Sequence, residues 1–84
     1  MSLEIDHLVM GSILANFPTD KVEQNLSLNA KLVDDFGLVQ SEIHSLGQAL
    51  EKDLQKLGLP NFTDMQISRW RTVKDIVDTV SSLI

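Results

Sequence analysis

The 84-residue sequence contains no cysteine, only two histidines and only four aromatic side chains. Without cysteine, the chain cannot form disulfides, thiolate zinc sites or iron–sulfur clusters, and it has no cysteine nucleophile. The two histidines, His7 and His44, are too few for a histidine-rich metal site. We therefore expect a protein without a bound metal ion.

Basic residues are also scarce, since seven lysines and arginines face twelve acidic residues and the formal net charge is −5. This balance argues against a nucleic-acid partner, because lysine and arginine supply most of the affinity for phosphate backbones. It argues equally against binding to anionic membrane surfaces. The whole net charge falls in residues 1–42, whereas residues 43–84 are balanced. A basic partner would therefore be steered toward the first half of the chain.

The sequence has no apolar run near the roughly 18–20 residues that a membrane-spanning helix needs. Residues 1–6 include two acids and lack the basic segment that opens a signal peptide. These features predict a soluble, cytoplasmic protein that does not contact membranes. A chain of this length forms one domain, residues 1–84, with little room for a deep pocket beside its core. We therefore predict a single domain that is not an enzyme.

Two stretches near the ends of the chain show the apolar spacing of amphipathic helices. The first covers residues 2–16 and stops before Pro18, because the residue before a proline is pushed out of the helical region. The last begins after Thr72, which we predict to be its N-cap. Its apolar side comprises Val73, Ile76, Val77 and Val80.

A central helix is predicted to begin near Gln40 or Ser41 and to run to about Lys56. Gly58 follows at the place where a C-terminal cap is expected. The apolar side of this helix comprises Ile43, Leu46, Leu50, Leu54 and Leu57. These residues predict that one side of the central helix faces the core.

The connections between the three long helices differ from each other. Residues 19–31 are predicted to be a loop that apolar side chains anchor to the core, and not a regular element. Residues 63–68 are predicted to form a short helical turn capped by Thr63, with Met65 and Ile67 facing inward. The sequence thus predicts an all-α fold, a bundle of three main helices plus a short helix before the last one.

Four short motifs occur in order along the chain. Residues 26–38 read Leu-Ser-Leu-Asn-Ala-Lys-Leu-Val-Asp-Asp-Phe-Gly-Leu, and residues 49–51 read Ala-Leu-Glu. Leu-Pro follows at 59–60, and Thr-Val-Lys-Asp-Ile-Val at 72–77. Together with the helix order, these motifs resemble the acyl carrier protein family, which typically reads Ile-Thr-Pro-Asp-Ala-x-Leu-x-Asp-Asp-Leu-Gly-Leu, Ala-Leu-Glu, Ile-Pro and Thr-Val-x-Asp-Leu-Val. The resemblance covers most of residues 22–80 and implies an acyl-carrier-like bundle.

The chain departs from this family at the residue that carries the chemistry. Family members have Asp-Ser-Leu after the Gly-Leu, and the serine hydroxyl receives a 4′-phosphopantetheine arm. Here Gln40 stands at the serine position, and Val39 replaces the aspartate that helps to organise a metal during arm transfer. Ser41 lies one residue later, and one step along a helix turns a side chain by about 100° and moves it about 1.5 Å. Ser41 is therefore either a displaced attachment site or a helix N-cap.

The resemblance implies a carrier protein that is not itself a catalyst. It would hold an acyl or related group as a thioester on a phosphopantetheine arm at Ser41, as in fatty acid or polyketide biosynthesis. Its partners would then be a phosphopantetheinyl transferase and acyl-processing enzymes. Gln40 and Val39 favour an alternative, a degenerate carrier-like fold that has no arm and binds a protein partner as an interaction or regulatory module.

The resemblance also places a partner surface on the exposed side of the central helix. The matching residues are Ser41, His44, Ser45, Gln48, Glu51 and Lys52. This side is nearly neutral here, whereas it is usually strongly acidic in the family. Because electrostatic steering falls with the product of the charges, partners that select an acidic surface are expected to bind weakly.

Three other groups have the composition of functional sites. Asp34 and Asp35 could form a carboxylate pair, but they lack ligand partners at a suitable spacing, and we predict a solvated turn. Trp70 lies between two arginines and could stack on a base, but we predict that it anchors the core. His44 could titrate near neutral pH, but without a paired nucleophile we predict an exposed surface residue, and the same for His7.

Overall fold

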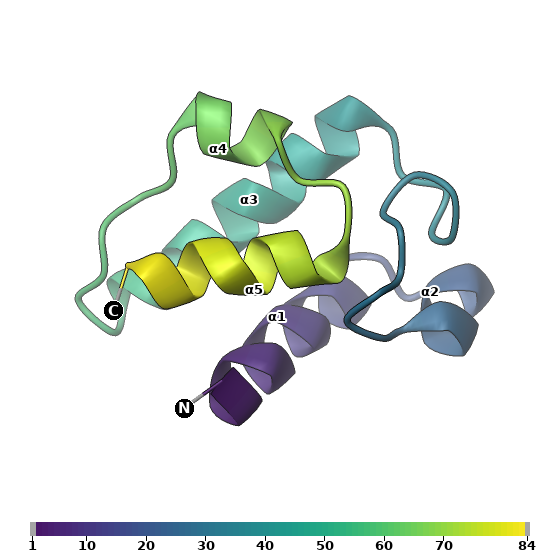
Figure 1. The fold of residues 1–84 in the computed structure, drawn as a ribbon, viewed down its shortest axis with the longest axis horizontal. Helices are drawn as coiled ribbons and strands as arrows, with labels where there is room; N and C mark the ends of the chain where they lie inside the picture. The colour runs from purple at the N-terminus through teal and green to yellow at the C-terminus, as the bar shows by residue number, and fades with distance from the viewer. Residues whose placement is uncertain (1, 84) are drawn as a thin grey trace.

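Five helices make up the fold in the computed structural model, which describes residues 2–83 (Figure 1). They are α1 (Ser2–Asn16), α2 (Asp20–Asn25), α3 (Gln40–Gln55), α4 (Asp64–Ser68) and α5 (Val73–Ser82). These residues include no strand, and their only β-type pairing is an isolated bridge between Lys31 and Thr72. The predicted all-α fold, with three long helices and a short one before the last, is confirmed. Within the described residues, no helix is long and apolar enough to cross a membrane.

Three threonines mark the starts of helices α2, α4 and α5. Thr19, Thr63 and Thr72 are extended, and each hydroxyl oxygen accepts a hydrogen bond from the N–H three residues later, at 3.3, 3.1 and 3.3 Å. Such caps satisfy N–H groups that have no partner within the helix. The predicted caps Thr63 and Thr72 are therefore confirmed.

Helix α2 corrects the prediction that residues 19–31 contain no regular element. The helix has six residues, and Asp20 in its first turn suits the positive end of the helix dipole. Val22 is its only buried side chain. A helix that buries a single side chain shows no apolar periodicity, and the sequence pattern therefore missed it.

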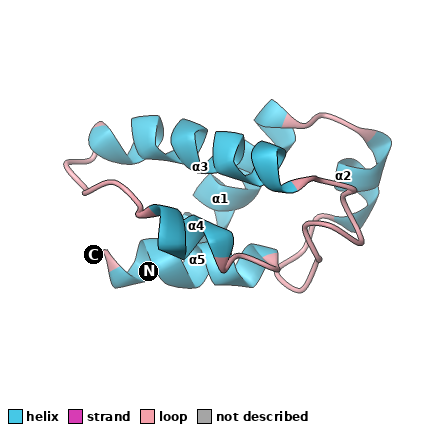
Figure 2. Ribbon diagram, turned by 90° about the horizontal axis from the view of Figure 1, so that it is seen from above, coloured by secondary structure: helices cyan, strands magenta, loops and turns pink. Residues whose placement is uncertain are grey.

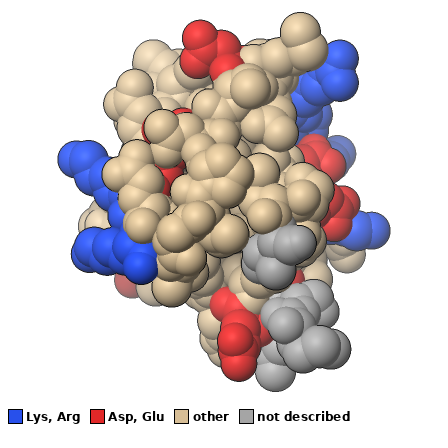
Figure 3. All heavy atoms as spheres, turned by 90° about the vertical axis from the view of Figure 1, so that its left-hand side faces the viewer, with Lys and Arg blue, Asp and Glu red and all other residues tan. Residues whose placement is uncertain are grey.

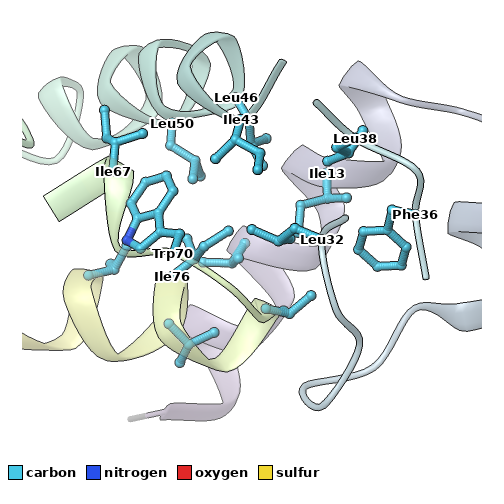
Figure 4. Packing of buried hydrophobic residues seen from close by; sticks show 14 of the residues in the cluster. Ile13, Leu32, Phe36, Leu38, Ile43, Leu46, Leu50, Ile67, Trp70 and Ile76 are labelled. Atoms are coloured by element: carbon cyan, nitrogen blue, oxygen red, sulfur yellow. The ribbon is translucent and has the colours of Figure 1, made fainter. Parts of the chain in front are cut away.

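Trp70 is central to the hydrophobic core and is only 2% exposed (Figure 4). Its Nε1 donates a hydrogen bond to Thr79 Oγ1 at 3.0 Å, and its ring meets the Phe62 ring edge to face, with the centroids 5.1 Å apart. The predicted role as a core anchor is confirmed, and a ring buried in this way is not free to stack on a base. Other side chains that are almost fully buried are Val9, Ile13, Val22, Leu32, Ile43, Leu46, Leu50, Leu54, Val73, Ile76 and Val80.

The end of α3 turns Leu57 away from the core. Gly58 has a φ of +77°, which glycine adopts at no steric cost. Its N–H donates to Gln55 O and the Leu59 N–H donates to Leu54 O, both at 3.0 Å, as in a Schellman cap. The predicted cap is confirmed, but Leu57 is 66% exposed and does not continue the apolar side of α3 as predicted.

Ile67 is the buried side chain of α4, and it packs against α3. A Cβ added to Gly47 would lie 2.8 Å from Ile67 Cδ1, so the absence of a side chain at Gly47 makes room for Ile67. Ile67 is buried as predicted, whereas Met65 is 65% exposed and does not face inward. A helix of five residues has only one turn, and the position of Ile67 leaves Met65 on the outer side.

Candidate functional site

The loop between α2 and α3 lies at one end of the bundle, opposite the connection between α3 and α4 (Figure 2). Backbone hydrogen bonds fasten this loop to the start of α5. The Leu32 N–H donates to Arg71 O at 2.9 Å, and the Val73 N–H donates to Ala30 O at 3.1 Å. Leu38, directly before α3, is buried in the core. The first residues of α3 therefore follow a loop that is fixed at both ends.

Asp35 and Gly37 close the loop on itself. Asp35 Oδ2 accepts a hydrogen bond from the Lys31 N–H at 2.8 Å, and the Gly37 N–H donates to Val33 O at 2.9 Å. Gly37 has a φ of +71°, a conformation that a side chain would strain. Asp34 is exposed and Asp35 half-buried. Residues 2–83 contain no cluster of three or more side chains suited to hold a metal ion, and the Asp35 carboxylate stabilises the turn.

Helix α3 begins without a side-chain cap. Its N-cap is Val39, which is extended and has no side-chain oxygen, but Glu42 Oε1 accepts a hydrogen bond from the Val39 N–H at 2.9 Å. Gln40 is the first helical residue and Ser41 the second. Of the two alternatives for Ser41, the N-cap is therefore wrong, because the helix starts before it.

Gln40 and Ser41 are both exposed but differ in their contacts. Gln40 Nε2 lies 3.2 Å from His44 Nδ1, which is also 3.1 Å from Gln40 O. The Ser41 carbonyl accepts a hydrogen bond from Ser45 Oγ at 3.1 Å, while the Ser41 hydroxyl has no partner among the described residues. The site thus presents an unengaged hydroxyl in the first turn of a 16-residue helix, where backbone N–H groups and the dipole favour a phosphate.

His44 does not pair with Ser41. Both contacts of its Nδ1 are made with Gln40, and the ring is half-buried, less exposed than predicted. A serine nucleophile needs a base within hydrogen-bond reach of its hydroxyl. His44 Nδ1 is engaged by Gln40 and is not paired with the Ser41 hydroxyl. His7 is exposed, as predicted.

The residues of the predicted partner surface fall into two groups. Ser45, Gln48 and Lys52 are exposed, and they line a groove that α3 forms with α1. His44 and Glu51 are half-buried. Glu51 Oε1 accepts a hydrogen bond from the Phe62 N–H at 3.2 Å, so this carboxylate holds the connection between α3 and α4.

Two hollows of the surface were not predicted. The groove between α1 and α3 has a volume of about 890 Å³, and its walls include the small residues Gly11, Ala15, Ser45 and Ala49. Small residues four positions apart in both helices were the signal that the sequence offered. A second hollow, of about 440 Å³, is lined by Leu57 and Leu59 together with side chains of α1, α3 and α5. Figure 3 views the end of the bundle that carries the α3–α4 connection, where most of the surface is uncharged.

Comparisons with known proteins do not assign the chain to a family. No protein-family model matches the sequence, and no curated protein matches it either. The resemblance to acyl carrier proteins therefore depends on the motifs in residues 26–77 and on the order of the helices.

Proposed function

We propose that the protein is an atypical acyl carrier protein whose attachment residue is Ser41. The observation that carries this proposal is the exposed Ser41 hydroxyl, which has no hydrogen-bond partner among the described residues and lies in the first turn of α3. The fixed loop before it and the order of the helices are what a carrier needs to present an arm at one end of a bundle. In this function the protein is a shuttle, and separate enzymes act on the group that it carries.

The attachment step follows from the chemistry of coenzyme A. The Ser41 oxygen forms a bond with the phosphorus that carries the pantetheine, and the bond from that phosphorus to 3′-phosphoadenosine 5′-phosphate breaks. The hydroxyl proton leaves through the transferase or water, and the product is a 4′-phosphopantetheine phosphodiester. The thiol at the end of the arm then holds an acyl or related group as a thioester. The positive end of the α3 dipole stabilises the phosphate charge.

Intact-protein mass spectrometry tests this proposal directly. The full chain is incubated with coenzyme A and a broad-specificity phosphopantetheinyl transferase, and we expect a mass increase of one arm. Ser41→Ala should remain unmodified, because it lacks the hydroxyl but keeps the loop. An unmodified wild-type chain would overturn the proposal, provided that Gln40→Ser, which places a hydroxyl at the position that aligns with the family's serine, is modified under the same conditions.

The alternative is a carrier-like interaction module without an arm. Two features of the start of α3 favour it: Gln40 occupies the aligned position and contacts His44, and Val39 has no carboxylate with which to organise a metal. This function requires a protein partner and no mass increase in any host. A phosphopantetheine-modified Ser41 peptide recovered from native cells would contradict it.

A further inference from the structure

The groove between α1 and α3 is bordered by small side chains at helical spacing. Gly11 and Ala15 lie four residues apart in α1, and Ser45 and Ala49 lie four residues apart in α3. Residues four apart lie on the same side of a helix, one turn above the other. On each wall of the groove, two neighbouring turns therefore carry only small side chains. Small side chains at a contact allow two helices to approach more closely, so these turns leave room for a third helix.

Packing within the chain does not explain why residue 11 is a glycine. It lies in the interior of a 15-residue helix, where glycine is less favourable than alanine by roughly 0.5–1 kcal/mol. A Cβ added at Gly11 would meet no atom within 4 Å. The described chain therefore gains no contact from the missing side chain, whereas a molecule seated in the groove would.

Ser12 contributes a buried and weakly engaged hydroxyl to the wall of the groove. Its side chain lines the groove and is only 8% exposed, the only buried polar residue among those described. Its oxygen receives one contact, from Asn16 Nδ2 at 3.5 Å, which is longer than ordinary N–H···O hydrogen bonds of about 2.7–3.2 Å. Its proton has no acceptor among the described residues. A polar group of a helix seated in the groove would give this proton an acceptor.

The charge of the groove identifies the kind of partner. Lys52 in α3 and Lys56, the C-cap residue of α3, are exposed, Asp53 is half-buried, and His7 is exposed on the α1 wall. The groove thus carries a positive excess in a chain whose net charge is −5. An acidic partner complements this charge.

We propose that this groove binds an acidic amphipathic helix of another protein. The small residues admit the backbone of that helix, its acidic side chains face Lys52 and Lys56, and a polar side chain reaches Ser12. Docking of an amphipathic helix into a groove is a recurring mode of peptide recognition, in which the apolar face of the helix lies in the groove. The proposal does not depend on modification of Ser41, because the groove lies along α1 and the Ser41 side chain does not line it.

The test uses a display library of helical peptides of about 18 residues, with acidic, basic, polar and small residues at the randomised positions. The full chain is the target, and selected peptides are measured by fluorescence anisotropy. We expect acidic helices to be enriched. Gly11→Leu, which fills the groove, and the double variant Lys52→Glu/Lys56→Glu should each weaken their binding by about tenfold or more.

Matched controls lie outside the groove. Gln24→Leu adds an exposed leucine on α2, and Lys21→Glu/Lys31→Glu reverses two exposed charges elsewhere; both should bind the peptides as the wild type does. Circular dichroism verifies that each variant is folded. Enrichment of basic or uncharged peptides, no enrichment, or equal binding to Gly11→Leu would overturn the proposal. A wild-type dimer that dissociates in Gly11→Leu would overturn it in favour of a second copy as the occupant.

Discussion

The two interior glycines of the long helices, Gly47 in α3 and Gly11 in α1, face opposite kinds of surroundings. At Gly47 an added Cβ would lie 2.8 Å from Ile67 Cδ1 and 3.4 Å from Trp70 Cζ3. At Gly11 it would meet nothing within 4 Å. The same residue type therefore makes room for packing on one side of the bundle and leaves a groove open on the other.

This difference divides the molecule into a closed side and an open side. On the closed side, α3 meets α4 and the Trp70 ring, and the side chains are almost fully buried (Figure 4). On the open side, α3 and α1 leave a groove of about 890 Å³. We infer that the closed side supplies stability and that the open side is available to a partner.

The largest expected effect belongs to the closed side. Trp70→Ala removes the largest of the fully buried side chains and should lower the free energy of unfolding by about 3–5 kcal/mol. Urea denaturation followed by circular dichroism measures the loss. Trp70→Phe, which keeps an aromatic ring but loses the hydrogen bond to Thr79, should cost clearly less. A loss below about 1 kcal/mol in Trp70→Ala would show that this side is not the more tightly packed one.

Gly47→Val tests the close approach of α4. The new methyl groups would overlap Ile67 and press on Trp70, so the free energy of unfolding should fall by about 1–3 kcal/mol. The same substitution made in an Ile67→Ala background should cost less, because the atom that it meets first has been removed. Equal costs in the two backgrounds would contradict the contact, and the double-mutant cycle measures this coupling.

Val39→Asp extends the comparison to the exposed start of α3. Valine is among the poorest N-cap residues and Val39 is 57% exposed, whereas aspartate accepts hydrogen bonds from the first turn and suits the helix dipole. The free energy of unfolding should rise by about 1 kcal/mol. Val39→Ala is the control and should change stability little. A decrease in Val39→Asp would mean that the valine makes contacts that stabilise the fold.

The smallest expected effect belongs to the open side. Gly11→Ala should raise the free energy of unfolding by about 0.5–1 kcal/mol, because alanine favours the helix and its methyl group meets no atom. Thermal and urea unfolding of the two proteins measure the gain. A lower stability of Gly11→Ala would mean that the new methyl group meets other atoms of the chain. It would contradict the difference that we draw between Gly11 and Gly47.

Sequence patterns predicted the long helices because each of them repeats its apolar residues over several turns. The same patterns failed in short segments. Helix α2 buries only Val22, and Met65 belongs to a helix of a single turn. Leu57 lies after the last residue of α3, within the Schellman cap that ends the helix. In each case one or two contacts decide the orientation, and periodicity carries no information about single contacts.

The candidate site was predicted only in part. The loop was recognised from residues 26–38, and Gln40 and Ser41 are the first two residues of the helix that follows it. Helix α3 begins at Gln40, within the predicted range, but its cap was not predicted, because Val39 has no polar side chain and the hydrogen bond comes from its own N–H to Glu42 Oε1. The groove lies between α1 and α3, which are far apart in the sequence. The residue pattern of one helix does not show how far away the other helix lies.

The sequence alone determined the three long helices, the threonine caps at Thr63 and Thr72 and the glycine cap at Gly58, because each depends on residues close together in the chain. The tertiary structure decided which glycine is packed and which is open, where α4 presses on α3, and which of the polar side chains is buried. These properties depend on distances between elements that only the folded chain brings together. A glycine in a helix has the same local chemistry everywhere, and its surroundings decide whether it serves packing or leaves an open groove.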